Sequence, residues 1–118
     1  MYQILEGLNK TSGIIGSMVV GKDGIVIAAD LNTQVEEETI GALAASITSN
    51  VQKSLDRLKT LPVQQVTIES DNAKLFFTDA KLGLLVVIAE PDVNIGLVRL
   101  EIRNAVLKLS KQEVTYRE

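Results

Sequence analysis

The links between the strand-like segments of this chain are so short that they restrict its fold to a largely antiparallel sheet. β-branched runs and alternating apolar residues predict strands at residues 14–20, 25–30, 65–70, 75–80 and 84–90. The first two strands are joined by a turn of a few residues, and so are the last three. A parallel neighbour would instead need a crossover of roughly a dozen residues or more. The segment at 84–90 is apolar on both faces, so we expect it in the middle of the sheet.

Three segments with apolar residues at helical spacing complete the pattern. We expect helices at residues 2–10, 36–59 and about 96–110. The apolar stripe of the long middle helix consists of Ile40, Leu43, Ala44, Ile47, Val51, Leu55 and Leu58. The order α-β-β-α-β-β-β-α predicts an α/β protein of the α+β type, with helices packed on a five-stranded antiparallel sheet. We expect a single domain over residues 1–118, because this is a normal domain length.

The stretch GSMVVGKDG, residues 16–24, matches the nucleotide-binding P-loop G-x-x-x-x-G-K-[ST] at every position except the last, which is Asp23. The residues between the glycines end in two valines, which favour an extended strand over a loop that cradles phosphate. Asp23 would repel phosphate, and the next segment is a strand instead of the helix whose N-terminus binds the anion. Since Asp23-Gly24 is a strong turn signal, we interpret residues 21–24 as a hairpin turn and expect no nucleotide site.

The composition removes most catalytic and metal chemistry. The chain has no cysteine and no histidine, which excludes disulfides, thiolate chemistry, the commonest general base and the commonest metal ligand. The carboxylates of residues 36–38 could bind a hard cation, but their position at the start of a helix favours a role in stabilising the helix dipole. We therefore expect no catalytic residues, no metal and no cofactor, in a protein that is not an enzyme.

Charge and aromatic content limit the partners in turn. The net charge is −3, lysine and arginine are scattered, and the aromatic residues are Tyr2, Phe76, Phe77 and Tyr116. A nucleic-acid binder needs a basic face or a row of stacking aromatics, so we expect no nucleic-acid partner. The longest apolar run, residues 82–89, is far shorter than the ~20 residues that span a bilayer. We expect a cytoplasmic protein without a signal peptide or a membrane span.

One side of the middle helix carries unusually small residues. Gly41, Ala45 and Ser49 recur at every fourth position, and Ala42 and Ser46 lie one step around the helix. A solvated helix face normally carries long charged side chains, and a mid-helix glycine costs about 1 kcal/mol relative to alanine. Because small residues allow close approach, we expect this side to contact another chain. The alternative is that both sides of the helix are buried within the monomer.

The strand at residues 65–70 is a second candidate for contact between chains. Val66 and Ile68 alternate with polar residues, so one face of this strand is apolar. An edge strand of this kind is suited to pairing with its own copy. We therefore expect this strand to lie at an edge of the sheet.

These pieces, in this order, resemble the roadblock domain, the family of the roadblock-type dynein light chains and of bacterial MglB-like regulators. The resemblance covers essentially the whole chain and rests on GIIGSMVVGKDGIVIAAD, IGALAASITSNVQKSLDRL, VTIESDNAKLFF and LLVVIAEPDVNIGLVRLEIRNAV. It implies a five-stranded antiparallel sheet with one helix on one face and two on the other. It also implies a homodimer, or a heterodimer with a paralogue, in which the second helices pack side by side and the middle strands pair.

The resemblance implies a function as well as a fold. Roadblock dimers serve as platforms for small Ras-like GTPases, and MglB-like members stimulate GTP hydrolysis without an arginine finger, by reshaping the GTPase. Carried over to this sequence, the GTPase contacts fall on Ala42, Ala45, Ser46, Ser49 and Lys53. The dimer contacts fall on Gly41, Ala45, Ser49, Val66, Thr67 and Ile68.

Two versions of this function remain open from the sequence. The leading hypothesis is a dimeric regulator that activates a Ras-like GTPase, and the alternative is a passive dimerisation or scaffold module in a motor or signalling complex. The tail after Leu109, SKQEVTYRE, has only nine residues. In MglB-like proteins a longer C-terminal extension has been linked to nucleotide exchange, so we do not expect an exchange activity here.

Overall fold

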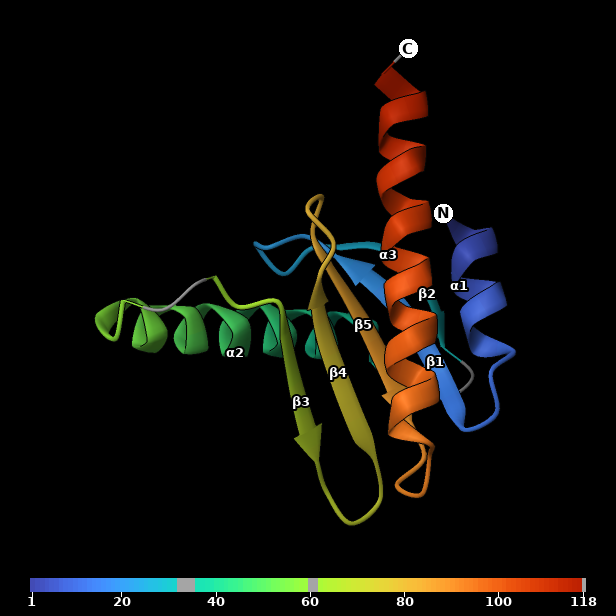
Figure 1. Cartoon of the computed structure of the whole chain (residues 1–118), viewed down its shortest axis with the longest axis horizontal. Helices are drawn as coiled ribbons and strands as arrows, with labels where there is room; N and C mark the ends of the chain where they lie inside the picture. The colour runs from blue at the N-terminus through green and yellow to red at the C-terminus, as the bar shows by residue number, and fades with distance from the viewer. Residues whose placement is uncertain (32–35, 60–61, 118) are drawn as a thin grey trace.

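The computed structural model describes residues 1–31, 36–59 and 62–117, with side chains described as far as residue 111. Its elements are α1 Tyr2–Asn9, β1 Ile14–Val20, β2 Val26–Leu31, α2 Glu37–Arg57, β3 Gln65–Glu69, β4 Lys74–Asp79, β5 Leu84–Ala89 and α3 Ile95–Arg117. All strands join one antiparallel sheet in the order β2-β1-β5-β4-β3. Figure 1 shows α3 in front of this sheet and α2 crossing behind it. The order of elements and the antiparallel sheet predicted from the sequence are confirmed.

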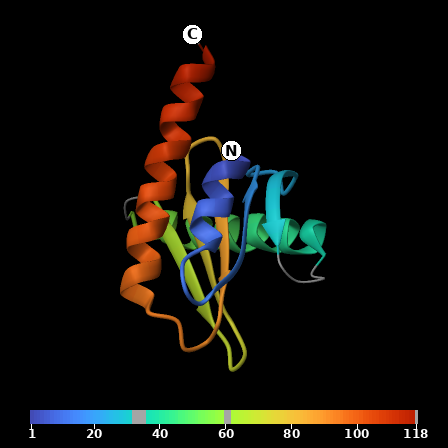
Figure 2. The same cartoon turned by 90° about the vertical axis from the view of Figure 1, so that its right-hand side faces the viewer.

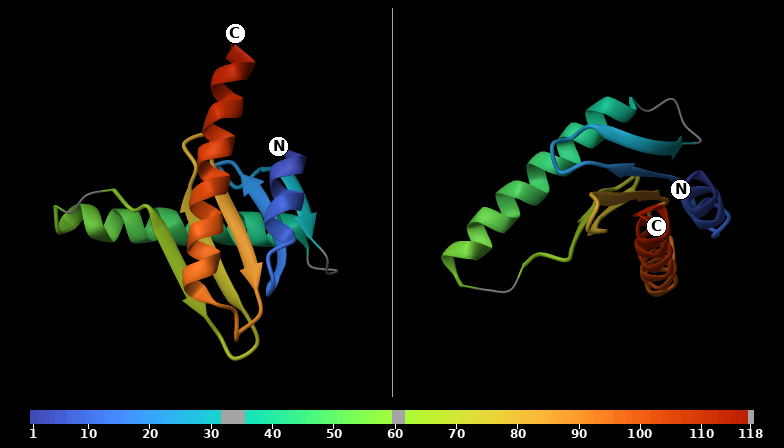
Figure 3. Two further views of the ribbon diagram at one scale, coloured as in Figure 1. Left: turned by 45° about the vertical axis from the view of Figure 1, so that its right-hand side comes forward. Right: turned by 90° about the horizontal axis from the view of Figure 1, so that it is seen from above.

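Helices cover both faces of the sheet, two on one face and one on the other. On the first face, Leu5 of α1 and Ile102 of α3 belong to a core that includes Phe76 of β4. On the opposite face, Ala44 of α2 and Phe77 of β4 belong to a second core. Figure 2 and the view from above in Figure 3 show these two helix layers on either side of the sheet. The arrangement is the one that the roadblock resemblance implies.

β5 is the central strand, as its sequence predicts. All six of its residues, Leu84–Ala89, are buried. β5 pairs with β1 on one side and with β4 on the other. The two edges of the sheet are therefore β2 and β3, and β3 is the edge strand that the sequence predicts.

A small polar network fixes α1 on the sheet. Ser17 of β1 is fully buried, and its hydroxyl donates to Asn9 Oδ1 at 2.8 Å and lies 3.4 Å from the carbonyl oxygen of Leu5. The Asn9 side-chain amide in turn donates to the carbonyl oxygen of Asp30 at 2.7 Å. A buried hydroxyl without such partners would be costly. These contacts therefore tie the end of α1 to both strands of the first hairpin.

Two glycines allow α2 to lie directly on the hairpin between β1 and β2. Gly24 has a φ of +90°, which side chains rarely tolerate, and Gly41 of α2 is buried beside it. A Cβ atom at Gly41 would lie 3.0 Å from the Gly24 carbonyl oxygen and 3.3 Å from side-chain atoms of Val20 and Val26. The helix is therefore anchored through its N-terminal half, on the β2 side of the sheet.

The last helix is longer than the sequence predicts. We expected it to end near Ser110, with SKQEVTYRE as a tail, but α3 continues to Arg117. The prediction followed the apolar stripe, whose last member is Leu109. Figure 2 shows the C-terminal part of α3 passing beyond the sheet. No glycine or proline follows to end the helix. The other element boundaries differ from the predicted ones by at most two residues.

We predict that substitutions at Gly41 and Gly7 have different effects on stability. A Cβ at Gly7 of α1 meets nothing within 4 Å, so Gly7→Ala should raise the free energy of unfolding by about 0.5–1 kcal/mol through helix propensity. Gly41→Ala should raise the free energy of unfolding by less than Gly7→Ala does. Gly41→Val should lower the free energy of unfolding by about 1–3 kcal/mol, because the larger side chain overfills the contact with the hairpin. Urea unfolding at one fixed protein concentration measures all three. A stable Gly41→Val variant would contradict this seating of α2.

Candidate interaction surface

The Gly-Lys-Asp-Gly segment is a tight turn between β1 and β2. The Gly24 N–H donates to the Gly21 carbonyl at 2.9 Å, and the Gly21 N–H donates to the Ile25 carbonyl at 2.8 Å. The Asp23 carboxylate accepts the Ile25 N–H at 3.0 Å. The predicted hairpin is confirmed, with Lys22 exposed at its tip.

The side of α2 that faces the sheet has small residues at its two buried positions. Gly41 and Ala44 are the buried residues of this helix. Gly41 contacts the hairpin of its own chain, so the assignment of Gly41 to a side turned away from the core is wrong. The reason is that the glycine permits the close approach of α2 to Gly24. For this residue the alternative holds, namely burial within the monomer.

The other predicted contact residues of α2 form a flank beside the hairpin, which we call the outer flank. It consists of Ala42, Ala45, Ser46, Ser49 and Lys53. All of these residues are exposed except Ala45, which is half-buried. The flank is small and polar, and Lys53 is its single charged residue. Its contact with a partner stays a prediction.

The apolar stripe of α2 lies on the opposite side of the helix and is only partly covered. Ile40 and Ile47 pack at the margin of the second core and remain half-buried. Leu43 is 45% exposed and Leu58 is 70% exposed. The sequence analysis placed all four residues in the apolar stripe of this helix. Ala44 is the one fully buried member of the stripe, and the larger side chains lie at the margin of the contact with the sheet.

The apolar face of β3 lies on the same side of the sheet as α2. Val66 and Ile68 pack against the second core together with Leu75 of β4, and all three remain half-buried. Thr67 pairs with Phe76, a residue of the first core, and therefore lies on the opposite face. Among the predicted dimer contacts of β3, Val66 and Ile68 thus share one face, and Thr67 can contribute on that side only through its backbone.

Helix and strands together form one apolar surface, which we call the α2–β3 surface. It consists of Ile40, Leu43, Ile47, Val66, Ile68 and Leu75. The main sheet contacts of α2 are with β2 and β5, so α2 leaves part of β3 and β4 uncovered. Large exposed apolar patches are typical of surfaces that contact other proteins. The sequence analysis missed the helix half of it, because a stripe at helical spacing looks the same whether its own sheet or a second chain covers it.

The glutamates at the start of α2 are exposed and serve the helix itself. Glu36 accepts a hydrogen bond from the Thr39 hydroxyl at 2.9 Å, and Glu37 and Glu38 lie in the first turn. Among the described residues, no group of three or more acidic, histidine or cysteine side chains is placed to hold a metal ion. None of the described helices combines the length and the apolar character needed to cross a membrane.

Solved structures share this fold. The Roadblock/LC7 domain from Streptomyces avermitilis superposes with a TM-score of 0.90 at 20% sequence identity, covering 97% of this chain and 98% of that one. Myxococcus xanthus MglB superposes with a TM-score of 0.89 at 23% identity, covering 96% of this chain and 94% of that one. A structure of MglB with a tetrameric arrangement superposes with a TM-score of 0.86 at 20% identity, covering 93% of this chain and 85% of that one. At these identities the likeness shows the fold, which is the roadblock fold.

Sequence comparison places the chain in a family as well. The Roadblock/LC7 domain matches residues 1–89. The chain is also 39% identical over 107 residues to two uncharacterized proteins of Methanocaldococcus jannaschii, MJ1340 and MJ0310, covering 91% of this chain and 94% of each relative. The chain therefore belongs to the Roadblock/LC7 domain family, which confirms the resemblance seen in the sequence.

We predict that Lys22 contributes little to stability. Its ammonium lies 3.9 Å from the Asp79 carboxylate, with the two side chains 65% and 38% exposed. An exposed pair at this distance is weak, so Lys22→Gln should change the free energy of unfolding by less than about 1 kcal/mol. Asp23→Ala should cost more, about 0.5–1.5 kcal/mol, because it removes the hydrogen bond to Ile25 inside the turn. Urea unfolding compares the two variants, and a larger loss for Lys22→Gln would contradict this ranking.

Proposed function

We propose that this chain dimerises through the α2–β3 surface and, as a dimer, binds and regulates a small Ras-like GTPase, without catalytic residues of its own. Membership of the Roadblock/LC7 domain family supports a regulatory or scaffold role. The resemblance to MglB-like regulators suggests the GTPase as partner. The observation that carries the proposal is the uncovered α2–β3 surface beside an open strand edge.

The length of α2 supports the dimer. Its 21 residues span about 31 Å at 1.5 Å per residue, whereas five strands spaced by about 4.8 Å give a sheet only about 19 Å wide between its outer strands. Figures 1 and 3 show the C-terminal half of α2 passing beyond β3. The projecting end carries Leu58, which is 70% exposed. A helix end of this kind has apolar surface to offer to a second chain.

A two-fold axis beside β3 would use the projecting end and the uncovered sheet together. When β3 pairs with β3 of a second copy, each α2 extends over the β3 and β4 strands of the other copy. There Val66, Ile68 and Leu75 are half-buried in the single chain. The contact is self-complementary, as a two-fold interface requires, and it satisfies the open backbone groups of the edge strand. The tetrameric arrangement of MglB supports self-association in proteins of this fold.

The outer flank of α2 supports a separate contact with the GTPase. It lies on the opposite side of the helix from Ile40 and Ile47, so the proposed dimer contact leaves it accessible. Its small side chains allow a partner backbone to approach closely, and Lys53 is available for an acidic group. In the dimer, two such flanks lie on the same face of one continuous sheet and form a platform. A passive scaffold would use the same dimer but would leave the GTP turnover of a bound GTPase unchanged.

We predict that Leu43→Asp converts the dimer into a monomer. The substitution removes apolar contact worth about 1–2 kcal/mol per copy, which over two copies weakens dimerisation roughly 30-fold or more. Leu100→Asp is the matched control, because Leu100 is 52% exposed on α3, on the other side of the sheet. Sedimentation velocity measures the oligomeric state of each variant, and circular dichroism confirms that both are folded. A wild-type chain that sediments as a monomer, or a Leu43→Asp variant that stays dimeric, would contradict the α2–β3 interface.

We predict that Ser46→Arg reduces the effect of the protein on a GTPase while the dimer stays intact. The arginine occupies the outer flank, where close approach needs a small side chain, so binding should weaken about tenfold or more. Ser12→Arg is the control, because Ser12 is exposed in the loop between α1 and β1. GTP hydrolysis by Ras-like GTPases from the same genome, with and without each variant, gives the readout. If the protein binds a GTPase without changing its GTP turnover, the result favours the scaffold function. If Ser46→Arg acts on the GTPase as well as the wild type does, the outer flank is not the GTPase contact.

A further inference from the structure

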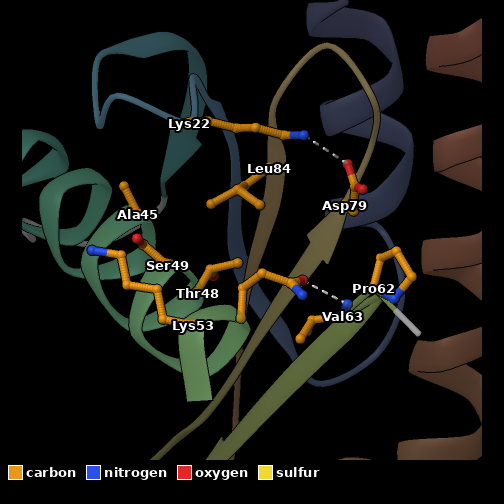
Figure 4. A pocket seen from close by; sticks show the side chains of 10 residues that line it. Lys22, Ala45, Thr48, Ser49, Lys53, Pro62, Val63, Asp79 and Leu84 are labelled. Atoms are coloured by element: carbon orange, nitrogen blue, oxygen red, sulfur yellow. Dashed lines mark hydrogen bonds and ion pairs between the residues drawn. The ribbon is translucent and has the colours of Figure 1, made fainter. Parts of the chain in front are cut away.

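A pocket of about 440 Å³ lies between α2 and the turn ends of the sheet. Its walls come from the β1–β2 hairpin, the middle of α2, the segment before β3 and the facing ends of β4 and β5. Figure 4 shows these side chains around the pocket. We propose that the pocket binds a small amphipathic anion, that is, a molecule with an apolar body and one negatively charged group. The proposal concerns the isolated chain and does not rest on a GTPase partner.

The size and walls of the pocket suit a small molecule. Its volume falls within the range of about 300–1,000 Å³ that is usual for ligand sites and equals that of roughly 15 waters at about 30 Å³ each. Ala45, Val63 and Leu84 line it with apolar groups. The Val63 N–H donates to Gln52 Oε1 at 2.8 Å, which holds the segment before β3 against α2. The wall is therefore fixed by a hydrogen bond before any ligand binds.

Thr48 places an unpaired hydroxyl group beside the pocket. Its hydroxyl oxygen is buried and has no hydrogen-bond partner among the described residues. A threonine within a helix usually bonds the carbonyl four residues earlier, but this one does not, and Thr48 lines the pocket. Buried hydroxyls are nearly always paired. Because the oxygen itself is buried, the Thr48 side chain would have to rotate before a polar group on an occupant could supply the missing partner.

The charges at the pocket favour an anion. Lys22, Lys53 and the single carboxylate of Asp79 belong to its lining, which gives a formal charge of +1. Figure 4 shows the Lys53 side chain extending away from Asp79, so Lys22 is the cation placed to meet an anion. Lys22 and Asp79 approach only to 3.9 Å, and the Lys22 side chain is 65% exposed. Figure 4 shows Lys22 reaching across toward Asp79 at the rim. Such a loose pair leaves the ammonium able to turn to a ligand anion.

The pocket and the α2–β3 surface occupy opposite sides of α2. Ala45 and Ser49 line the pocket, whereas Ile47, two residues from each of them, belongs to the α2–β3 surface. Residues two apart on a helix do not face the same way. The proposed dimer contact therefore does not fill the pocket, and the two sites can be tested separately.

Anilinonaphthalene sulfonate, which combines an apolar ring system with one anionic group, is a suitable probe. We expect its fluorescence to rise on binding the folded wild-type chain at one site per chain. Lys22→Gln should weaken this binding about threefold to tenfold, and Asp79→Asn should tighten it by a similar factor, because the two substitutions change the local charge in opposite directions. Lys10→Gln, which removes an exposed lysine at the end of α1, is the matched control and should leave the affinity unchanged.

Filling the pocket provides an independent test. Ser49→Trp places a large side chain on the pocket wall and should abolish binding of the dye, whereas Ser12→Trp, on the loop before β1, should not. Thr48→Val should weaken binding about threefold to tenfold by removing the hydroxyl. The same variant should raise the unfolding midpoint of the ligand-free chain, because it removes an unpaired buried polar atom. A merely structural threonine would not produce these two opposite effects.

Some results would overturn the inference. If Ser49→Trp binds the dye as well as Ser12→Trp does, the dye occupies another surface and the pocket is not its site. If Lys22→Gln and Asp79→Asn change the affinity in the same direction, or neither changes it, the pocket does not select an anion. Dye binding that disappears in Leu43→Asp but survives in Ser49→Trp would place the dye on the α2–β3 surface instead.

Discussion

The close approach of Gly24 and Gly41 determines which surfaces of the molecule remain exposed. With no side chain at either position, the backbone of α2 rests against the turn between β1 and β2. The N-terminal half of α2 is thereby held at one edge of the sheet, and its remaining length runs across the strands and past β3. The projecting end of α2, its half-covered apolar stripe and the uncovered part of β3 and β4 all follow from that contact.

This seating gives α2 two sides with different physical character. On one side, Ile40 and Ile47 pack against the second core and remain partly exposed. Covering them with a second apolar surface would contribute about 25 cal/mol per Å² of apolar area removed from water. Association also has an entropic cost, so a stable dimer needs the helix stripe and the open β3 edge together. The outer flank offers little apolar area. Contact there depends on close fit and polar groups, which is typical of a transient interface.

The sequence predicted the sheet well because turn chemistry and alternation are local signals. Asp23-Gly24 identified the first hairpin, and the doubly apolar run at 84–90 identified the central strand. The two sides of α2 were harder, since periodicity shows which residues share a side but not which surface covers them. Gly41 was therefore assigned to the side expected to contact another chain although it touches its own hairpin. Leu43 was assigned to the same apolar stripe as the buried Ala44 although Leu43 is 45% exposed. The residues that line the pocket around Thr48 are distant from one another in the chain, so no local sequence pattern predicts the pocket.

The pocket and the outer flank have Ala45, Ser49 and Lys53 in common. If both proposals hold, an anion in the pocket alters the surface that a GTPase meets, through its bulk and by neutralising a lysine charge. Sharing residues does not by itself fix the sign of this coupling, because a ligand shifts an equilibrium only when its affinity differs between the two states. An occupant that stays below the rim leaves the small side chains accessible and lowers the positive charge. An occupant that projects past Ser49 blocks the approach outright. The depth at which the apolar body sits therefore decides whether such a ligand modulates or excludes the partner.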